Sequence, residues 1–488
     1  MIQHFADHKI SSALNRIDQS FHIHRSILLV IVWIMVFGEV CGQNGPPNAD
    51  HLWLNKYSNP IFAADLILAA VLPDRQSVST SQFTPQPGSR IRIDEARFAD
   101  IDRHALRAPQ SVRHSVERLA AYLTEPCRND LEKVRSIYRW ITENISYDVE
   151  GYRSGNYGDL SPESVLSSGS AVCSGYTGLF GMLADASGIE VIEISGWAKG
   201  IGYEAGDPIL GPTNHAWNAV KIGDGWYLID STWGAGSSDG IRFVRQFEEH
   251  YFLTPPEQFI FDHLPEDPSW QLLEYPLSES QFVHLPHVKS HFFRNGLEIV
   301  SHFQSVVETD HQISIALQTS LDLSLSARLI RNGQSLDQSL TFTQRTENSQ
   351  YQINALFPAP SDYILRIFVR PIEENGPYWQ AIDYKIKVGR GMPGPIGFPE
   401  IMGAFAKYGV TLHAPRSGYL KIGEVEPFIL YVPKARKVAV IMGDSWFHLK
   451  ENNGFFEGNV KVQEGEIRVC AEFLREGQYE CLLQYTAF

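Results

Sequence analysis

Residues 170–188 read SAVCSGYTGLFGMLADASG, and this stretch decides the fold. It predicts a helix from Ala171 to Ser187 that Gly188 closes. Cys173 lies at the start of this helix, where unpaired backbone N–H groups and the positive end of the helix dipole favour a thiolate over a thiol. Cys173 is therefore a candidate nucleophile.

The same predicted helix carries three glycines, Gly175, Gly178 and Gly181. Each glycine costs about 1 kcal/mol relative to alanine in a helix interior, so packing has to offset about 3 kcal/mol. At a spacing of three, the glycines fall near one stripe of the helix. Such a stripe would let another backbone approach the helix closely.

Downstream of the helix, three stretches have the composition of strands: 191–197, 215–222 and 226–230. The apolar runs on either side of Gly223-Asp224-Gly225 indicate a hairpin. With a two-residue turn at Asp224-Gly225, Asp230 lies opposite Ala219 and about 13 Å along the strand from His215. That offset is too long for a hydrogen bond, so a bulge, a longer loop or strong twist has to shorten it.

The hairpin carries two further chemical groups. His215 stands in NHAWN (214–218), and Asp230 stands in YLIDSTW (227–233). A cysteine that attacks, a histidine that takes and returns the proton and an aspartate that orients the imidazole are the parts needed for acyl transfer. Each residue alone has a plainer interpretation, as a buried thiol, a core histidine and a strand-end cap; their joint occurrence favours a triad.

Other residues near the candidate triad are less specific. Trp217 and Trp233 flank it and are candidates for walls of a substrate cleft. We interpret His263 as structural. A zinc site built from the three triad residues lacks a fourth ligand at a familiar spacing, so we predict neither a metal nor a cofactor.

The residues before the cysteine predict helices. Apolar residues recur at helical spacing over 112–123 and again over 131–145. Asn129 followed by Glu132 resembles a capping box that starts the second helix at Asp130. Ser161-Pro162 indicates a further short helix.

The three candidate residues, in AVCSGY (171–176), HAWN (215–218) and DSTW (230–233), resemble those of the transglutaminase-like superfamily, kyphoscoliosis peptidase and hillarin type. DID (100–102), YRWI (138–141) and FDHLP (261–265) support the resemblance, which is strong over about 97–270 and weaker beyond. It implies an α+β papain/transglutaminase-like core with a catalytic cysteine, histidine and aspartate. Known relatives include cytoskeleton-associated proteins, some proposed as peptidases.

After about Tyr275 the pattern changes to strands only, with an Asn332-Gly333 turn, and predicts two all-β, sandwich-like domains separated by a Gly and Pro stretch at 391–399. The expected organisation is a signal peptide or anchor at 1–42, an extension and linker at 43–90, the transglutaminase-like domain at 91–275, and β domains at 276–390 and 391–488. Cys470 and Cys481 fall opposite each other if their hairpin centres on Arg475-Glu476. In an exported chain the two cysteines are close enough to form a disulfide or to remain two thiols; otherwise they are two buried thiols.

Length and composition limit the other possibilities. The 488 residues are 43% hydrophobic and 20% charged, typical of a folded multidomain protein. A net charge of -15 argues against nucleic-acid binding. The apolar run at 27–37 is short for a membrane span and suits an export signal, so we expect secretion or membrane anchoring. The alternative is a cytoplasmic protein in which this run is buried or uncleaved.

The sequence thus predicts a cysteine-dependent acyl-transfer enzyme acting on polypeptides. Water as the acceptor gives a peptidase or deamidase, and an amine gives a transglutaminase. The alternative is a binding or structural protein that keeps the fold without turnover.

Overall fold

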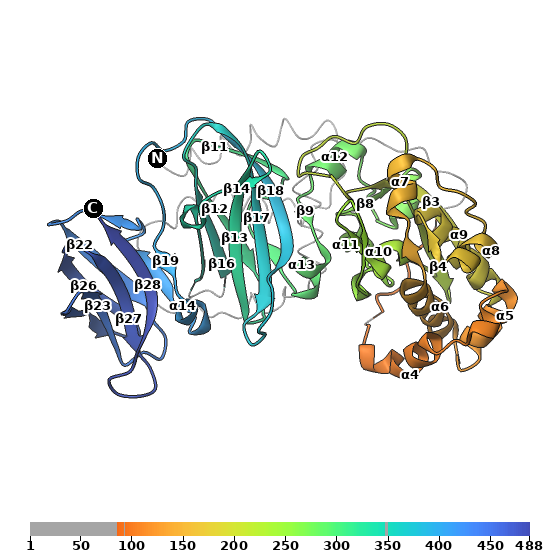
Figure 1. The fold of residues 1–488 in the computed structure, drawn as a ribbon, viewed down its shortest axis with the longest axis horizontal. Helices are drawn as coiled ribbons and strands as arrows, with labels where there is room; N and C mark the ends of the chain where they lie inside the picture. Colours follow the sequence, from red (N-terminus) through yellow and green to blue (C-terminus); the bar gives the residue numbers. More distant parts are fainter. Residues whose placement is uncertain (1–84, 92, 347–349) are drawn as a thin grey trace, which may run out of the picture. The chain divides into compact units, whose positions relative to one another are not determined.

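The computed structural model describes residues 85–91, 93–346 and 350–488 (Figure 1). The predicted signal or anchor at 1–42, its apolar run at 27–37 and most of the predicted extension at 43–90 lie outside these residues. Within the described residues, every helix is too short or too polar to cross a bilayer.

A layer of helices precedes the site: α4 (Glu95–Leu106), α5 (Val116–Thr124), α6 (Asp130–Asn144), α7 (Val149–Ser154) and α8 (Pro162–Ser168). Helix α6 begins where predicted, because the Asn129 side chain accepts the Glu132 N–H at 3.0 Å. The Glu132 carboxylate reaches back to the N–H of Arg128, one residue before the expected Asn129. The apolar faces of α4, α5 and α6 bury one common core.

Helix α9 (Cys173–Ala186) begins two residues later than predicted, so that Cys173 is its first residue. Its three glycines do not form the expected contact surface. A Cβ on Gly175 would lie 2.5 Å from that of Ala171, whereas Gly178 and Gly181 have only the Glu193 carboxylate within 4 Å. The stripe would let another backbone approach, but no other backbone comes within 4 Å of a Cβ placed on Gly178 or Gly181.

The sheet behind α9 has the order β5-β4-β3-β8 and is antiparallel throughout. Its strands are β3 (Val191–Ala198), β4 (His215–Ile222), β5 (Gly225–Ile229) and β8 (His263–Pro265), and α9 packs on β3 and β4. The short helix α10 (Ser231–Ala235) follows β5 directly. Further short elements complete this part of the chain: β1 (Ser146–Tyr147), β2 (Ser170–Ala171), β6 (Gly236–Ser238), β7 (Phe243–Arg245) and α11 (Pro256–Phe259).

Residues 86–89 lie along the edge of β5. The Gly88 N–H donates to the Trp226 carbonyl at 2.9 Å, and the Trp226 N–H donates to the Gln86 carbonyl at 2.9 Å. The two backbones are so close that a Cβ on Gly225 would lie 2.2 Å from the Gly88 Cα. This segment was predicted to be part of a linker, and it instead pairs with the sheet.

The first β region is a sandwich of two sheets, β10-β12-β16-β15 and β11-β18-β17-β13-β14, with β9 beside β18. The main strands are β12 (Gln312–Gln318), β13 (Leu323–Arg331), β15 (Thr341–Arg345), β16 (Gln350–Leu356), β17 (Ser361–Pro371) and β18 (Trp379–Val388). Asn332 and Gly333 form the predicted turn, with φ of 52° and 73°. The minor elements are α12 (Glu279–His284), β9 (His287–Val288), α13 (Ser290–Arg294), β10 (Glu298–Ile299), β11 (Val306–Thr309) and β14 (Gln334–Ser335).

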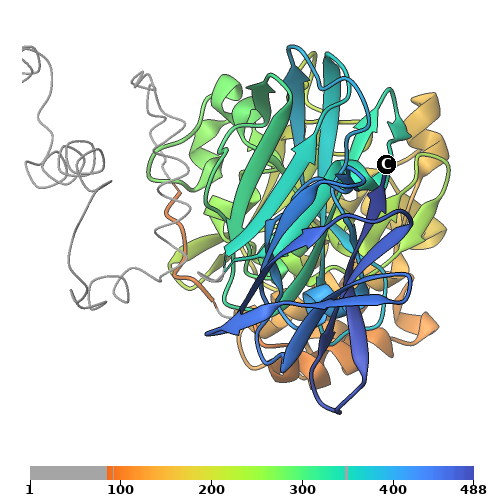
Figure 2. The same cartoon turned by 90° about the vertical axis from the view of Figure 1, so that its left-hand side faces the viewer.

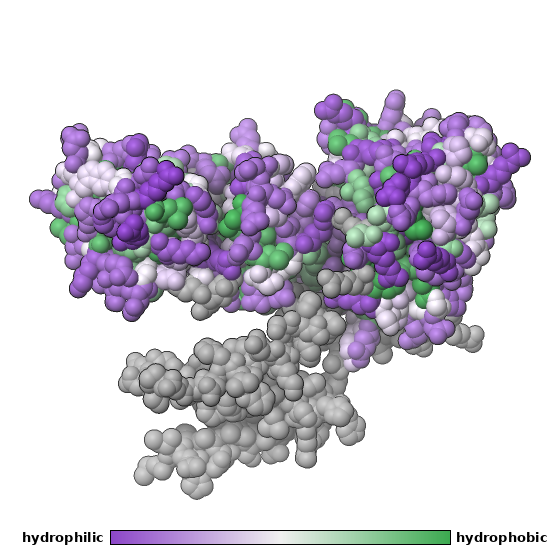
Figure 3. Space-filling view, turned by 90° about the horizontal axis from the view of Figure 1, so that it is seen from below, coloured by the Kyte–Doolittle hydropathy of each residue, from purple (hydrophilic) through white to green (hydrophobic). Residues whose placement is uncertain are grey.

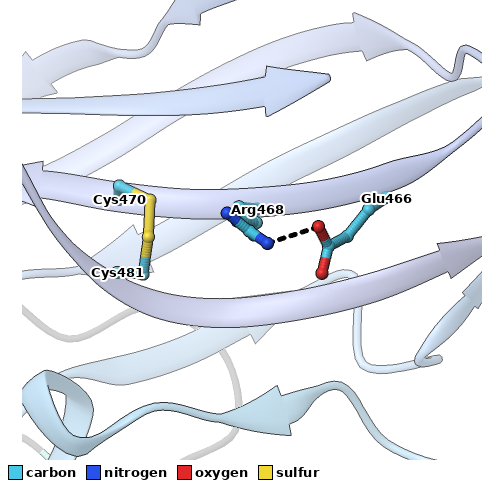
Figure 4. Close-up of a disulfide and its surroundings, with 4 residues drawn as sticks. All are labelled: Glu466, Arg468, Cys470 and Cys481. Carbon is cyan, nitrogen blue, oxygen red and sulfur yellow. Dashed lines mark hydrogen bonds and ion pairs between the residues drawn. A yellow bond between two sulfur atoms is a disulfide. The ribbon is translucent and has the colours of Figure 1, made fainter. Parts of the chain in front are cut away.

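The second β region, blue in Figure 2, is also a pair of sheets, β19-β28-β27-β23-β24 and β20-β22-β26-β25. Cys470 of β27 (Glu466–Glu472) pairs with Cys481 of β28 (Tyr479–Ala487), the predicted register, and the two sulfurs form a disulfide (Figure 4). The other elements are β19 (Glu400–Ile401), α14 (Gly403–Lys407), β20 (Thr411–Ala414), β21 (Tyr419–Leu420), β22 (Val425–Tyr431), β23 (Lys437–Met442), β24 (Ser445–His448), β25 (Lys450–Asn452) and β26 (Phe455–Lys461).

The predicted α+β core followed by two sandwiches is confirmed. The boundaries expected near 275 and 390 stay predictions, because the described residues from 85 to 488 all belong to one compact unit. The core of the first sandwich also contains Ile260, Phe261 and Leu264, which precede the expected boundary. The face shown in Figure 3 is mostly hydrophilic among the described residues, with smaller hydrophobic areas between.

Candidate active site

Cys173 is half-buried at the N-terminus of α9. Its backbone N–H belongs to the first helical turn and has no partner within the helix. The helix is tied to the sheet by the Asn218 side chain of β4, which donates to the Thr177 carbonyl at 3.3 Å. This bond fixes the cysteine helix on the strand that begins with His215.

The β4–β5 turn places Asp230 closer to His215 than the sequence suggested. Ile222 pairs with Gly225, so the turn residues are Gly223 and Asp224. Continuing this register puts Asp230 opposite Trp217, two residues and about 7 Å along the strand from His215. The side chains span that offset, and no bulge is needed.

The histidine and the aspartate form a direct, buried pair. His215 Nε2 lies 2.8 Å from Asp230 Oδ2, and both side chains are almost fully enclosed. The other carboxylate oxygen, Oδ1, accepts the N–H groups of Thr232 at 2.8 Å and Trp233 at 3.0 Å. Asp230 is therefore both the N-cap of α10 and the partner of His215.

The electrostatics of the site favour an ion pair between sulfur and imidazole. Burial opposes ionisation of Cys173, but a hydrogen bond and the charge of His215, helped by the Ala216 backbone, outweigh it and lower the pKa of the thiol. Burial likewise opposes the imidazolium, yet Asp230 and Cys173 raise the pKa of His215 to about 10. Because Asp230 occupies Nε2, Nδ1 is the ring nitrogen left for the sulfur.

His263 also contacts the site. Its Nε2 lies 3.0 Å from Asp230 Oδ2, the oxygen that already faces His215, and its Nδ1 lies 2.6 Å from Asp262 Oδ1. The Tyr251 hydroxyl donates to Asp262 Oδ2 at 3.1 Å. The sequence interpretation of His263 did not include this contact. An Asp-His pair inside the apolar run FDHLP was the signal that could have found it.

His215, Asp230 and His263 are also metal-ligand types, and their nearest ligand atoms lie within 4.8 Å of one another. The carboxylate oxygen is, however, in direct hydrogen-bond contact with both rings, at 2.8 and 3.0 Å. An ion between these atoms would need the rings to move apart. The arrangement observed is one of hydrogen bonds.

The two predicted cleft tryptophans differ. Trp217 is 1% exposed and packs edge-on against Phe259 and His263, so it belongs to the core and not to a cleft wall. Trp233 is half-buried, with its ring 5.4 Å from that of His215. Of the two tryptophans, Trp233 is the one that is partly exposed beside His215.

Cysteine at a helix start, packed on an antiparallel sheet that carries the histidine, is the arrangement of a transglutaminase-like domain. Residues 117–231 match the family model of the transglutaminase-like superfamily. Residues 279–399 match that of the KY-like, immunoglobulin-like domain. The chain therefore combines a transglutaminase-like domain with a KY-like immunoglobulin-like domain, which confirms the predicted resemblance.

Curated relatives agree with this assignment. The chain is 36% identical to kyphoscoliosis peptidase of Mus musculus over 207 residues, 42% of this chain and 31% of the relative. It is 28% identical to hillarin of Drosophila melanogaster over 291 residues, 56% of this chain and 35% of that protein. The chain thus spans about a third of the length of these relatives. A solved structure titled a TGase overlaps 33% of this chain and 37% of its own at 18% identity, with a TM-score of 0.20.

Proposed function

We propose that this protein is a cysteine-dependent acyl-transfer enzyme that acts on polypeptides through Cys173, His215 and Asp230. One observation carries the proposal: the buried contact of 2.8 Å between His215 and Asp230. His215 begins strand β4, which lies beside the helix that begins with Cys173. In this arrangement the Asp230 carboxylate stabilises a positive charge on His215, and the charged His215 stabilises a thiolate at Cys173. A half-buried thiol at the end of such a chain is poised to react.

In the proposed reaction the Cys173 sulfur attacks a carbonyl carbon of a peptide or a glutamine side chain. The C–N bond breaks, and the His215 imidazolium gives its proton to the leaving amine or ammonia. A water molecule or an amine then attacks the thioester, His215 takes its proton, and the sulfur leaves as thiolate. The N–H of Cys173 is one donor for the oxyanion. Asp230 keeps Nε2 protonated throughout, so that Nδ1 faces the sulfur.

The test compares purified wild-type protein with Cys173→Ala. We expect the wild type to react with iodoacetamide rapidly at mildly acidic pH and, given the right substrate, to release new amino termini or ammonia, or to incorporate a labelled amine. The variant should lose all of these. A folded wild type whose Cys173 reacts no faster than a free thiol would refute the proposal and favour the binding protein without turnover.

We also propose that the chain is exported, or anchored through residues 27–37. The apolar run supports this, as does the cross-strand disulfide, a bond that persists mainly in oxidising compartments. Amino-terminal sequencing of the mature protein from its native source tests it: loss of the first 42 residues is expected for a cleaved signal, and retention in a membrane fraction for an anchor. An intact amino terminus in a cytosolic fraction would contradict the proposal.

A further inference from the structure

A second histidine and a second aspartate lie next to Asp230 of the catalytic triad. His263 lies between two carboxylates, with Nε2 3.0 Å from Asp230 and Nδ1 2.6 Å from Asp262. His263 lies on β8, at one edge of the sheet. Asp230 follows β5, at the opposite edge. The His263 side chain is 0% exposed. Residues from two distant stretches thus meet on one carboxylate oxygen.

The hydrogen bonds fix the protons on this ring. An ionised carboxylate only accepts, so a ring with a carboxylate at each nitrogen has to donate from both nitrogens. Asp262 also accepts the Tyr251 hydroxyl at 3.1 Å. A neutral imidazole would point a lone pair at one of the carboxylates. The arrangement therefore matches an imidazolium at His263.

The surroundings suit a buried cation. The Phe259 ring stacks on His263 at 4.1 Å, and Trp233 lies at 4.5 Å, so aromatic faces cover the imidazole. The titratable and charged groups facing the ring or its carboxylates from the packed elements are Asp230, Asp262, Tyr251, His215, His250, Lys199 and Lys289.

We propose that His263 is a positively charged positioning residue that holds Asp230 and sets the pH range in which the Cys173–His215 ion pair exists. This rests on the proposed function. In that pH range the sign of the charge alternates from one side chain to the next in the order Cys173, His215, Asp230, His263 and Asp262. His263 thus keeps Asp230 ionised and aimed at His215 while limiting the negative potential at the catalytic imidazole.

Removing the His263 charge makes the potential at the ion pair more negative. Protons then bind more tightly to both groups. In the pH profile of Cys173 alkylation, the acidic limb is where the thiolate forms and the alkaline limb is where His215 loses its proton. Both limbs therefore move to higher pH. With the two rings 5.3 Å apart, the alkaline limb moves by up to about two pH units. The acidic limb moves less, because the sulfur is farther from His263.

The experiment records iodoacetamide rates against pH for wild type, His263→Gln and Asp262→Asn. Glutamine keeps one donor without the charge, and it should show the full shift. Asp262→Asn removes a negative charge while His263 keeps its charge beside Asp230, so both limbs should move by a smaller amount to lower pH. Lower rates with unmoved limbs in both variants, judged folded by circular dichroism, would overturn the proposal, since that is the result of a purely structural role.

A control variant is His104→Gln. His104 is a half-buried histidine of the same domain, and its Nε2 lies 2.8 Å from the Tyr122 carbonyl. Its limbs should coincide with those of wild type. A second measurement does not depend on catalysis or on a variant that folds. In ¹⁵N NMR of histidine-labelled wild type at pH 7, two buried rings, those of His215 and His263, should have both nitrogens protonated. A neutral tautomer at His263 would overturn the proposal even if Cys173 reacts as expected. Two protonated nitrogens at His263 together with an unreactive Cys173 would support the charge proposed for His263 and would refute the proposed function instead.

Discussion

Replacing Asp230 with asparagine tests the triad most directly. Asparagine keeps an oxygen for the N–H groups of Thr232 and Trp233, so α10 stays capped. An NH2 group then replaces Oδ2, so the variant loses the negative charge and the acceptor that face His215 at 2.8 Å and His263 at 3.0 Å. With the charges about 4 Å apart and an effective dielectric constant of about 20, the imidazolium loses about 4 kcal/mol of stabilisation.

This loss corresponds to about three pH units, at about 1.4 kcal/mol per unit. The pKa of His215, which stands at about 10 beside Asp230, should therefore fall to near neutrality in the variant. Below its pKa a raised histidine is charged, so wild-type Cys173 has an imidazolium beside it from acidic pH up to about 10. In the variant Cys173 loses that support, and its thiol pKa rises to or above the usual value of about 8.5.

The assay is the rate of iodoacetamide labelling of Cys173 at pH 7.5, above the pKa expected for His215 in the variant, read by mass spectrometry. A thiol with a pKa of about 8.5 is only about 10% ionised at this pH, so we expect the Asp230→Asn rate to be about 10-fold lower. Thermal melting and circular dichroism establish that the variant is folded. A folded variant that labels within threefold of wild type, with the same acidic limb, would show that Asp230 does not support the ion pair.

Three further outcomes are expected. Burial raises the pKa of Cys127 to about 11, so at pH 6 it should label far more slowly than Cys173 in the same digest. Arg135→Met leaves two carboxylates without their buried partner and should lower the free energy of unfolding by about 3 to 5 kcal/mol in urea titrations; a change below 1 kcal/mol would contradict this. Cys470→Ser opens a cross-link over 11 residues and should cost about 3 kcal/mol, and a reducing agent should affect wild type equally but leave the variant unchanged.

Local signals predicted most of the fold. Helix caps such as Asn129, period-two strands and the Asn332-Gly333 turn depend on neighbouring residues, so the sequence contains them. The predicted hairpin register was wrong because it depended on which of two overlapping residue pairs forms the turn. Both Gly223-Asp224 and Asp224-Gly225 contain a glycine suited to a turn, and choosing the second moved Asp230 by two positions along the strand.

The parts of the site that could not be predicted depend on contacts between distant stretches. Trp217 and Trp233 each lie within three residues of a triad member in the sequence. Both rings contact His263, and Trp217 also packs edge-on against Phe259, a contact between distant stretches. His263 lies 33 residues from Asp230 on a strand of three residues. No periodicity in so short a segment indicates which sheet edge it joins, and so the second histidine stayed out of the predicted site.

The segment that hydrogen-bonds to β5 bears on how the domain is expressed alone. A recombinant fragment cut at the predicted boundary, residue 91, would lack the hydrogen bonds of Gln86 and Gly88 to Trp226. The outer side of the sheet would then offer free N–H and C=O groups, together with the Tyr227 ring that now covers Gly88, to the same strand of another molecule. Such a fragment should self-associate, whereas one starting upstream of Pro85 should stay monodisperse at the same concentration.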